Sequence, residues 1–317
     1  MAFVGVDVGG TKTDVLVVDK NGNVLSRYIG GPGNYESLGI DKARNEIERS
    51  LSNALKSANL DKSDIEFAFF GMAGFDHEED KPTIEEILGT LGLKNYDFDN
   101  DGRVALKSGT GNDIGIMVSC GTGSISYAFD GKRVSRIGGY SWSFGERLGS
   151  YLIAGMITAT VVRVKDGREY GSILVDMLES EIGMSIESLR RLSREGLYSL
   201  SGYIPKIISV LFKAYESHDF LATKILLEIV EEIVKIARAH FNKLDFELPV
   251  RLILEGTFFK KSPGYLRDMI SSALGKDFKV VVPDHPPVVG AVLLALDRAG
   301  INSKKLFKKI VDQVTLS

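Results

Sequence analysis

One short pattern occurs twice in this chain and constrains the fold more than any other feature. An apolar strand runs into a Gly/Thr turn and leaves it as a second apolar strand, at residues 3–19 and again at 114–130. Glycines let the backbone turn tightly and bring its N–H groups close to a ligand. This favours a phosphate-binding turn over an ordinary hairpin turn at each of the two places. The repeat therefore predicts two similar domains, each with one turn that binds part of a polyphosphate.

The two copies differ at one acidic position. Asp7 ends the first strand of the first copy, and the equivalent residue in the second copy is Val118. A carboxylate at the end of an otherwise apolar strand can hold a metal ion, or a water bound to the metal, beside the phosphates. Two merely structural hairpins would need no acid, so the single acid favours one metal position, served by the first copy.

Composition limits the classes of function. The chain has 317 residues, 44% hydrophobic and 26% charged, which is typical of a globular protein of two ordinary domains. Its net charge of −3 offers no basic surface for nucleic acid, and its single cysteine, Cys120, excludes a disulfide framework or a cysteine-rich metal site in one chain. No apolar run reaches the roughly 18 residues of a membrane span, and the strand that begins at Phe3 leaves no room for a signal peptide. We expect a cytoplasmic protein without membrane or nucleic-acid partners.

Hydrophobic periodicity predicts an α/β chain. Strands are expected at 3–8, 13–19, 24–29, 65–70, 114–119, 124–130, 251–255 and 278–282. Helices are expected at 36–57, 83–91, 264–275, 288–298 and 303–314, with a mostly helical stretch over 150–243. The first domain is expected to span residues 1–112 and the second 113–302, with the C-terminal helix of 303–317 packing back on the first.

Further segments rich in glycine or acidic residues join the two turns, at 30–34, 71–74, 100–105, 138–146, 254–257 and 287–291. In this order and at these spacings the chain resembles the actin-like sugar kinases, which share the fold of hexokinase, actin and the Hsp70 ATPase. It is most similar to the N-acetylglucosamine kinases and archaeal hexokinases of the BadF/BadG/BcrA/BcrD ATPase family, over about residues 3–298. The resemblance implies an α/β fold of two actin-like (ribonuclease H-like) domains with an active-site cleft between them.

The resemblance also implies the residues that bind ATP and Mg²⁺. Those that match the first phosphate loop are Gly9, Gly10, Thr11, Lys12 and Thr13. Asp7 lies on the magnesium side, where it would hold the ion directly or through water. The second phosphate loop is matched by Gly121, Thr122 and Gly123, and the adenosine motif by Gly256.

On the sugar side, the resemblance assigns a hydroxyl ligand to Asn34 and the catalytic carboxylate to Asp101. The other positions that match sugar-binding residues are Gly74, Gly139 and Glu146. A sugar hydroxyl is a poor nucleophile, so a carboxylate within hydrogen-bond reach must accept its proton. Spacing alone does not single out Asp101, because it forms an acidic cluster with Asp97 and Asp99, any of which could cap a turn.

The chain departs from the family pattern at residues 145–150, which read Gly-Glu-Arg-Leu-Gly-Ser. The kinases that it resembles usually have Gly-Asp-Glu-Gly-Ser or Asp-Asp-Gly-Ser there. An ungapped match places Glu146 on the sugar-binding aspartate and Arg147 on the next acid. Because arginine suits a carboxylate, the substrate could be a sugar acid such as 2-keto-3-deoxygluconate. In the alternative, Arg147 points to solvent or pairs with a neighbouring acid.

These observations favour an ATP-dependent kinase that acts on a hexose or an N-acetylhexosamine. A second hypothesis is an ATPase that activates a partner enzyme. It is disfavoured because such activators hold an iron–sulfur cluster with two cysteines per chain, and this chain has only Cys120. A third is a sugar-sensing regulator, which usually carries an N-terminal DNA-binding domain that is not found here. The oligomeric state stays open, although homodimers are common in the family that the chain resembles.

Overall fold

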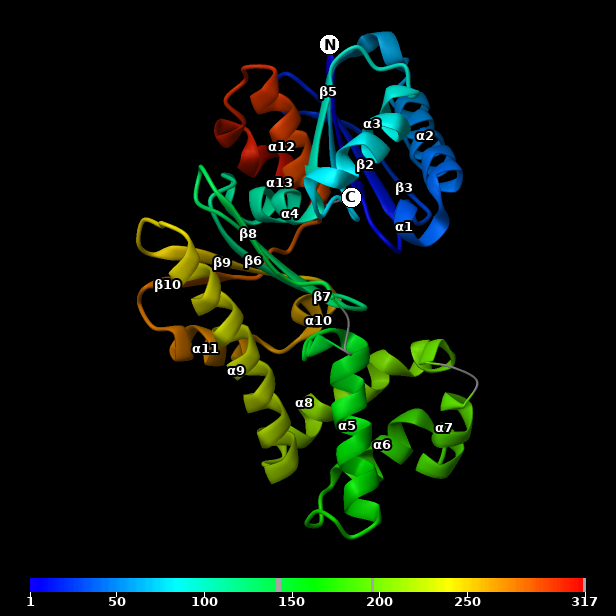
Figure 1. Cartoon of the computed structure of the whole chain (residues 1–317), viewed down its shortest axis with the longest axis vertical. Helices are drawn as coiled ribbons and strands as arrows, with labels where there is room; N and C mark the ends of the chain where they lie inside the picture. Colours follow the sequence, from blue (N-terminus) through cyan, green and yellow to red (C-terminus); the bar gives the residue numbers. More distant parts are fainter. Residues whose placement is uncertain (141–143, 195–196, 316–317) are drawn as a thin grey trace. The chain divides into compact units, whose positions relative to one another are not determined.

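The computed structural model describes residues 1–140, 144–194 and 197–315 (Figure 1). Contacts along the backbone group the chain into two compact units. The first unit comprises residues 1–117, 127–135 and 283–317, and the second comprises 118–126 and 136–282. This grouping differs from the boundary that we expected at residue 302, because residues 283–302 fall within the first unit.

The chain forms two five-stranded sheets whose strands follow the same order. In the first sheet the order is β3-β2-β1-β4-β5, with β1 Ala2–Val8, β2 Thr13–Asp19, β3 Val24–Gly30, β4 Ile65–Met72 and β5 Tyr96–Asn100. In the second it is β8-β7-β6-β9-β10, with β6 Gly115–Cys120, β7 Ser124–Phe129, β8 Val134–Gly138, β9 Val250–Glu255 and β10 Phe278–Val281. The repeated pattern in the sequence therefore corresponds to β1–β2 and β6–β7, and the prediction of two similar α/β domains is confirmed.

The register of the first sheet aligns the ends of all five strands. Strand β2 runs antiparallel to both β1 and β3, whereas β4 is parallel to both β1 and β5. One row of paired residues crosses the sheet at this edge, and it consists of Gly30, Thr13, Val8, Met72 and Asn100. Every loop that begins beyond this row starts from the same edge of the sheet.

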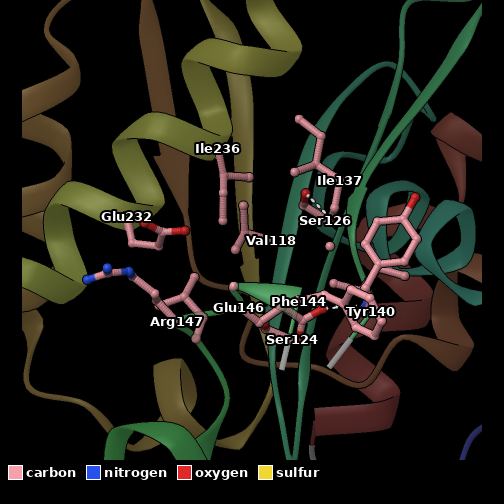
Figure 2. Close-up of a pocket in the computed structure, with 14 residues that line it drawn as sticks. Val118, Ser124, Ser126, Ile137, Tyr140, Phe144, Glu146, Arg147, Glu232 and Ile236 are labelled. Atoms are coloured by element: carbon pink, nitrogen blue, oxygen red, sulfur yellow. Dashed lines mark hydrogen bonds between the residues drawn. The ribbon is translucent and has the colours of Figure 1, made fainter. Parts of the chain in front are cut away.

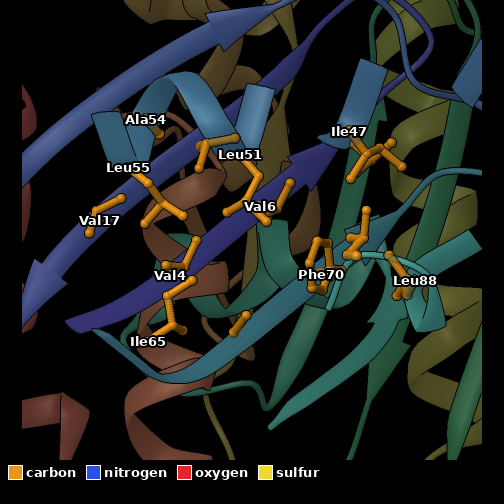
Figure 3. Close-up of a cluster of buried hydrophobic side chains, with 14 of the residues drawn as sticks. Val4, Val6, Val17, Ile47, Leu51, Ala54, Leu55, Ile65, Phe70 and Leu88 are labelled. Carbon is orange, nitrogen blue, oxygen red and sulfur yellow. The ribbon is translucent and has the colours of Figure 1, made fainter. Parts of the chain in front are cut away.

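Side chains that alternate along the strands build a core on each face of the first sheet. Helices α2 (Ile40–Ser57) and α3 (Lys81–Gly89) cover one face, where they pack on Val4, Val6 and Phe70 (Figure 3). The strand residues that point to the opposite face include Phe3, Leu16 and Phe69. Both sets of side chains are buried, so the sheet is a hydrophobic layer with helices on both sides.

Helices α12 (Val288–Arg298) and α13 (Phe307–Thr315) belong to the second of these two cores. The approach of α12 is so close that a Cβ atom on Gly5 of β1 would lie 2.2 Å from the backbone N of Val292. A Cβ on Gly290 would lie 1.9 Å from the carbonyl O of Val104, in α4 (Asp101–Thr110). Because α12 packs on β1 and α4, the segment that contains it belongs with the first sheet.

The second unit is mostly helical after its hairpin. Its helices are α5 Ser150–Lys165, α6 Leu174–Ile182, α7 Ile186–Ser193, α8 Ile204–Glu216, α9 Phe220–Lys243, α10 Thr257–Lys261 and α11 Gly264–Leu274. Helix α9 buries an apolar stripe that includes Leu226, Ile229 and Ile233. Within the described ranges, no helix combines the length and the apolar character that crossing a bilayer requires.

One predicted helix was wrong in detail, and two elements next to the site were missed. The expected helix at 36–57 is split by Gly39, which has φ +82°, so a short α1 (Tyr35–Leu38) precedes α2. Strand β5 and helix α4 were not predicted at all. In β5 the aspartates Asp97 and Asp99 alternate with aromatic residues, and in α4 two glycines hide the helical pattern.

The close packing of α12 gives a stability prediction. Replacing Gly290 by alanine should lower the free energy of unfolding by about 3 kcal/mol or more, because the added methyl group meets the backbone of α4. The matched control is Gly155→Ala in α5, where no atom lies within 4 Å of the new methyl group and the change should stabilise the protein by about 0.5–1 kcal/mol. Urea denaturation of both variants measures the difference, and equal midpoints would contradict the packing.

Candidate functional site

The residues that the sequence assigns to the first half of the site lie at one edge of the first sheet, most of them in loops and two, Asp7 and Thr13, at strand ends. These loops are 9–12, 30–34, 73–76 and the start of α4 at Asp101. They also touch one another through the backbone. The N–H of Gly33 donates to the carbonyl of Gly9 at 3.0 Å, and that of Ala73 donates to Val8 at 2.9 Å. The parallel and antiparallel pairing thus gathers the predicted residues of this unit along one edge.

The first phosphate loop has an open backbone. The N–H of Gly9 closes the turn on the carbonyl of Lys12 at 2.9 Å, while Gly10 and Thr11 are exposed. The Lys12 ammonium forms an ion pair with the carboxylate of Asp14 at 2.9 Å, and Asp14 is fully buried. Arg27 also donates to Asp14, through Nε at 3.0 Å and Nη2 at 2.7 Å. The Lys12 side chain is therefore anchored beside the loop by a buried carboxylate whose charge Arg27 also balances.

Thr13 differs from Thr11 in its surroundings. Thr13 is fully buried, and its hydroxyl oxygen has no hydrogen-bond partner among the described residues. A Cβ on Gly33 would lie 2.6 Å from that oxygen, so the loop at 30–34 packs directly over Thr13. In this conformation the Thr11 side chain faces solvent and the Thr13 side chain does not.

Asn34 and Gly74, both assigned to sugar binding, lie next to each other. Asn34 caps α1 by accepting a hydrogen bond from the N–H of Glu36 at 2.9 Å. A Cβ on Gly74 would lie 3.1 Å from the side-chain oxygen of Asn34, so glycine allows this approach. The Tyr35 hydroxyl donates to the carbonyl of Gly74 at 2.8 Å. Burial, together with the negative charge of Asp80, raises the pKa of Tyr35 to about 12, so this donor keeps its proton.

The structure separates the three acids of the cluster in and after β5. Asp97 forms an ion pair with Arg298 at 2.6 Å, and Asp99 forms one with Arg103, also at 2.6 Å. Both lie within the strand. Asp101 lies beyond the strand end, as the half-buried first residue of α4. Asp97 and Asp99 therefore form ion pairs along β5, and Asp101 differs from them in its position, at the edge that carries the loops.

Sequence reasoning missed Asn100, the last residue of β5. Its side-chain oxygen accepts a hydrogen bond from the N–H of Gly102 at 2.8 Å and thereby caps α4. Its amide nitrogen donates to the carbonyl of Phe75 at 2.8 Å and to Oδ1 of Asp76 at 3.2 Å. Asparagine is a preferred helix cap, so recognising α4 from the sequence would have pointed to this residue.

In the second unit the second phosphate loop lies against the start of α5. The N–H of Gly121 closes the turn on the carbonyl of Gly123 at 3.0 Å, and the N–H of Ser150 donates to Gly121 at 2.8 Å. Added Cβ atoms on Gly121 and Gly123 would meet nothing within 4 Å, so the loop backbone is open. A helix N-terminus carries partial positive charge, which favours a phosphate group nearby.

Gly256 and Cys120 meet directly behind this loop. Gly256 has φ +102°, and a Cβ atom there would lie 2.5 Å from the carbonyl O of Cys120. The sulfur of Cys120 accepts a hydrogen bond from the N–H of Gly149 at 3.3 Å. Burial raises the pKa of the Cys120 thiol to about 12, so it stays protonated and packs beneath the loop.

A pocket of about 250 Å³ adjoins Glu146 in the second unit (Figure 2). Its walls come from β6, β7, β8 and α9, with Val118, Ile137 and Ile236 among its apolar members. The carboxylate of Glu146 accepts a hydrogen bond from the N–H of Tyr140 at 2.6 Å. Residues 141–143, within the segment that was singled out at 138–146, lie outside the described residues.

Gly139, which is predicted to bind the sugar, directly follows strand β8. A Cβ on Gly139 would lie 3.0 Å from Nη2 of Arg136 and 3.3 Å from Cδ1 of Ile125, a residue that also lines the pocket. Gly139 and Glu146 are therefore both adjacent to the walls of this pocket.

Arg147 points away from Glu146, toward Glu232 of α9 (Figure 2). The pKa of the neighbouring Glu231 is lowered by its hydrogen bond to Lys235 and, to a smaller extent, by the charge of Arg147. Arg147 thus lies among acids on α9, which agrees with the alternative in which it pairs with a neighbouring acid.

Curated relatives cover nearly the whole chain. An N-acetyl-D-glucosamine kinase of Dictyostelium discoideum is 30% identical over 96% of this chain and 98% of its own length. An N-acetylmuramic acid/N-acetylglucosamine kinase of Clostridium acetobutylicum is 26% identical over 92% of this chain and 97% of its own length.

The fold is shared with a solved structure of a candidate N-acetylglucosamine kinase from Chromobacterium violaceum. The TM-score is 0.72 at 22% identity, with 93% of this chain and 98% of that chain covered. The two-domain actin-like α/β fold expected from the sequence is therefore confirmed. The sequence model of one family matches residues 4–295, and this chain accordingly belongs to the BadF/BadG/BcrA/BcrD ATPase family.

Proposed function

We propose that this protein is an ATP-dependent sugar kinase that phosphorylates a hydroxyl of N-acetylglucosamine or a closely related amino sugar. The observation that carries the proposal is the 30% identity to an N-acetyl-D-glucosamine kinase over 96% of the chain. The gathering of Asn34, Gly74 and Asp101 at the sheet edge that also carries the first phosphate loop supports it.

In the proposed reaction Asp101 is the general base. Its carboxylate accepts the proton of the sugar hydroxyl while the hydroxyl oxygen forms a bond to the γ-phosphorus and the bond from that phosphorus to the β–γ bridging oxygen breaks. ADP leaves with the electron pair of the broken bond. Asp101 suits this role because it is the first residue of α4, at the sheet edge that also carries the first glycine loop and the loop of Gly74.

The two glycine loops would bind the phosphates of ATP. In phosphoryl transfer the protein mainly positions the reactants and neutralises charge, and backbone N–H groups can do both. Gly9, Gly10 and Thr11 supply such groups in the first unit, and Gly121 to Gly123 supply them at the start of α5 in the second. Lys12 adds a positive charge beside the first loop.

The residues present fit a magnesium ion of the kind that accompanies a nucleotide. Mg²⁺ prefers oxygen ligands and is usually bound by one or two carboxylates together with phosphates and water. Among the described residues, no three metal-binding side chains gather into a site of their own. Asp7 is half-buried and lies two residues before the first glycine of the loop, so its carboxylate would be the protein ligand, directly or through water. When bound, the ion neutralises charge on the phosphates.

The pocket beside Glu146 supports an amino sugar over a sugar acid. Its walls contain apolar side chains such as Val118, Ile137 and Ile236, which suit the methyl group of an acetamido substituent. The sugar-acid alternative depended on Arg147, which also lines this pocket but whose side chain points toward Glu232 of α9. We propose that Glu146 binds a sugar hydroxyl at the edge of this pocket.

Replacing Asp101 by asparagine should lower kcat by at least about a hundredfold, because the proton acceptor is lost while the shape is kept. ATP binding should change little. The matched control is Asp97→Asn in the preceding strand β5, which removes only a partly exposed ion pair and should leave kcat nearly unchanged. A coupled assay for ADP release measures both variants, and equal turnover of wild type and Asp101→Asn would remove Asp101 from the mechanism.

Replacing Asn34 by serine should raise KM for the sugar up to about tenfold and lower kcat much less. The reason is that the lost contact binds the sugar equally well in the ground state and in the transition state. Serine can still cap α1, so a change in KM reports the contact with the sugar and not the loss of the helix. Steady-state kinetics with varied sugar at saturating ATP provide the measurement. A fall in kcat at constant KM would argue against a role in sugar binding.

Replacing Ile236 by phenylalanine should narrow the pocket and lower kcat/KM for N-acetylglucosamine by about tenfold relative to glucose. The control is Leu227→Phe, an exposed position on the same helix that does not line the pocket. The panel should include N-acetylmuramic acid and 2-keto-3-deoxygluconate. Wild-type activity confined to sugar acids would contradict the proposed substrate, and an equal loss on both neutral sugars would contradict the role of the pocket.

A further inference from the structure

Asn100 lies at the junction of β5 and α4, directly before Asp101. The residue is only 5% exposed, and its side chain makes three hydrogen bonds, two as donor and one as acceptor. A buried amide that is satisfied at both ends fixes the groups around it, because breaking any of these bonds would leave a polar atom unpaired. Asn100 is therefore a rigid connection and not a solvated side chain at a strand end.

The three bonds connect two parts of the candidate site. The acceptor bond from Gly102 fixes the first turn of α4, on which Asp101 lies. The donor bonds to Phe75 and Asp76 fix the loop that follows β4. No other uncharged side chain of this length offers a carbonyl oxygen and an NH₂ group on the same carbon, so both connections depend on asparagine.

The loop fixed by Asn100 leads back to the sugar side of the site. Gly74 lies directly before Phe75, is held by the Tyr35 hydroxyl and contacts Asn34. The backbone around Asp101 is also closely packed, since a Cβ on Gly71 would lie 3.5 Å from the Asp101 Cα. Asn100 thus sets the position of the loop of Gly74 relative to the helix turn of Asp101.

We infer that Asn100 is a positioning residue for the phosphoryl transfer. It fixes the position of the Asp101 carboxylate relative to the loop of Gly74, which contacts Asn34, the residue proposed to bind the sugar. Asn100 does this without touching the substrate. The inference rests on the proposed sugar kinase function. Its physical basis is that a displacement of about 1 Å in a reacting group can cost about a hundredfold in rate.

The test replaces Asn100 by serine. Serine is also a good helix cap, so α4 keeps its first turn, but its side chain is too short to reach Phe75 and it adds no charge. We expect kcat to fall between about tenfold and a hundredfold, with KM for ATP within about twofold of wild type. Asn100→Thr, which can also cap the helix, adds no charge and is likewise too short to reach Phe75, serves as a second variant if the serine variant does not fold.

A double-variant comparison separates positioning from general damage. In an Asp101→Asn background there is no base left to position, so adding Asn100→Ser should change kcat less than about twofold. A loss of equal size in both backgrounds would overturn the inference, as would full activity of Asn100→Ser alone.

The control is Asn95→Ala, near the opposite end of β5. The Asn95 amide also donates to β4, to the carbonyl of Glu66 at 3.0 Å, but Glu66 lies at the start of β4, away from the end that carries the loops. It should leave kcat unchanged. If the wild type phosphorylates no sugar, the proposed function fails before any variant is compared. If the wild type is active, Asp101→Asn is impaired and Asn100→Ser is not, only the positioning role fails.

Discussion

The pairing of β1 with β4 and of β4 with β5 is the interaction on which the rest of the first unit depends. These three strands are parallel, and their register brings Val8, Met72 and Asn100 into one row. Backbone hydrogen bonds in a sheet allow no small adjustment, because a slip by one residue would turn every side chain to the opposite face. The apolar residues on both faces oppose such a slip, so the core keeps the loops of the site aligned.

The second unit uses a similar sheet differently. Its loop of Gly121 to Gly123 lies against the start of α5, and Gly256 packs against Cys120 behind that loop. The helix supplies oriented N–H groups near the loop, whereas the first unit supplies the side chains of Asp7, Lys12 and Asp101. In the proposed kinase, one unit would therefore contribute the ionisable groups and the other mainly backbone dipoles and the pocket beside Glu146.

Much of the fold was predictable because its signals are local. Apolar runs that end in Gly/Thr turns predicted β1, β2, β6 and β7. The apolar stripe of α9 is long enough to identify that segment as a helix. Strand β5 was not predictable, because Asp97 and Asp99 find their partners Arg298 and Arg103 only in the folded chain. Likewise, the sequence does not reveal that the Thr13 hydroxyl is buried, because the loop at 30–34 that covers it is distant in the sequence. The role that we infer for Asn100 depends on Phe75, which is a neighbour in space alone.

The repeat of strand order also means that one position of the hairpin can be compared in two settings. In the first copy it is Asp7, at the end of β1, where we propose that magnesium is bound. In the second it is Val118, which lines the pocket beside Glu146 (Figure 2). A symmetrical pair of aspartates would place a second desolvated negative charge in that pocket, and a pair of valines would leave no ligand for an ion. The two halves can therefore have the same strand order and still do different work, provided that Asp7 and Val118 remain different. Any redesign of the chain should preserve this difference.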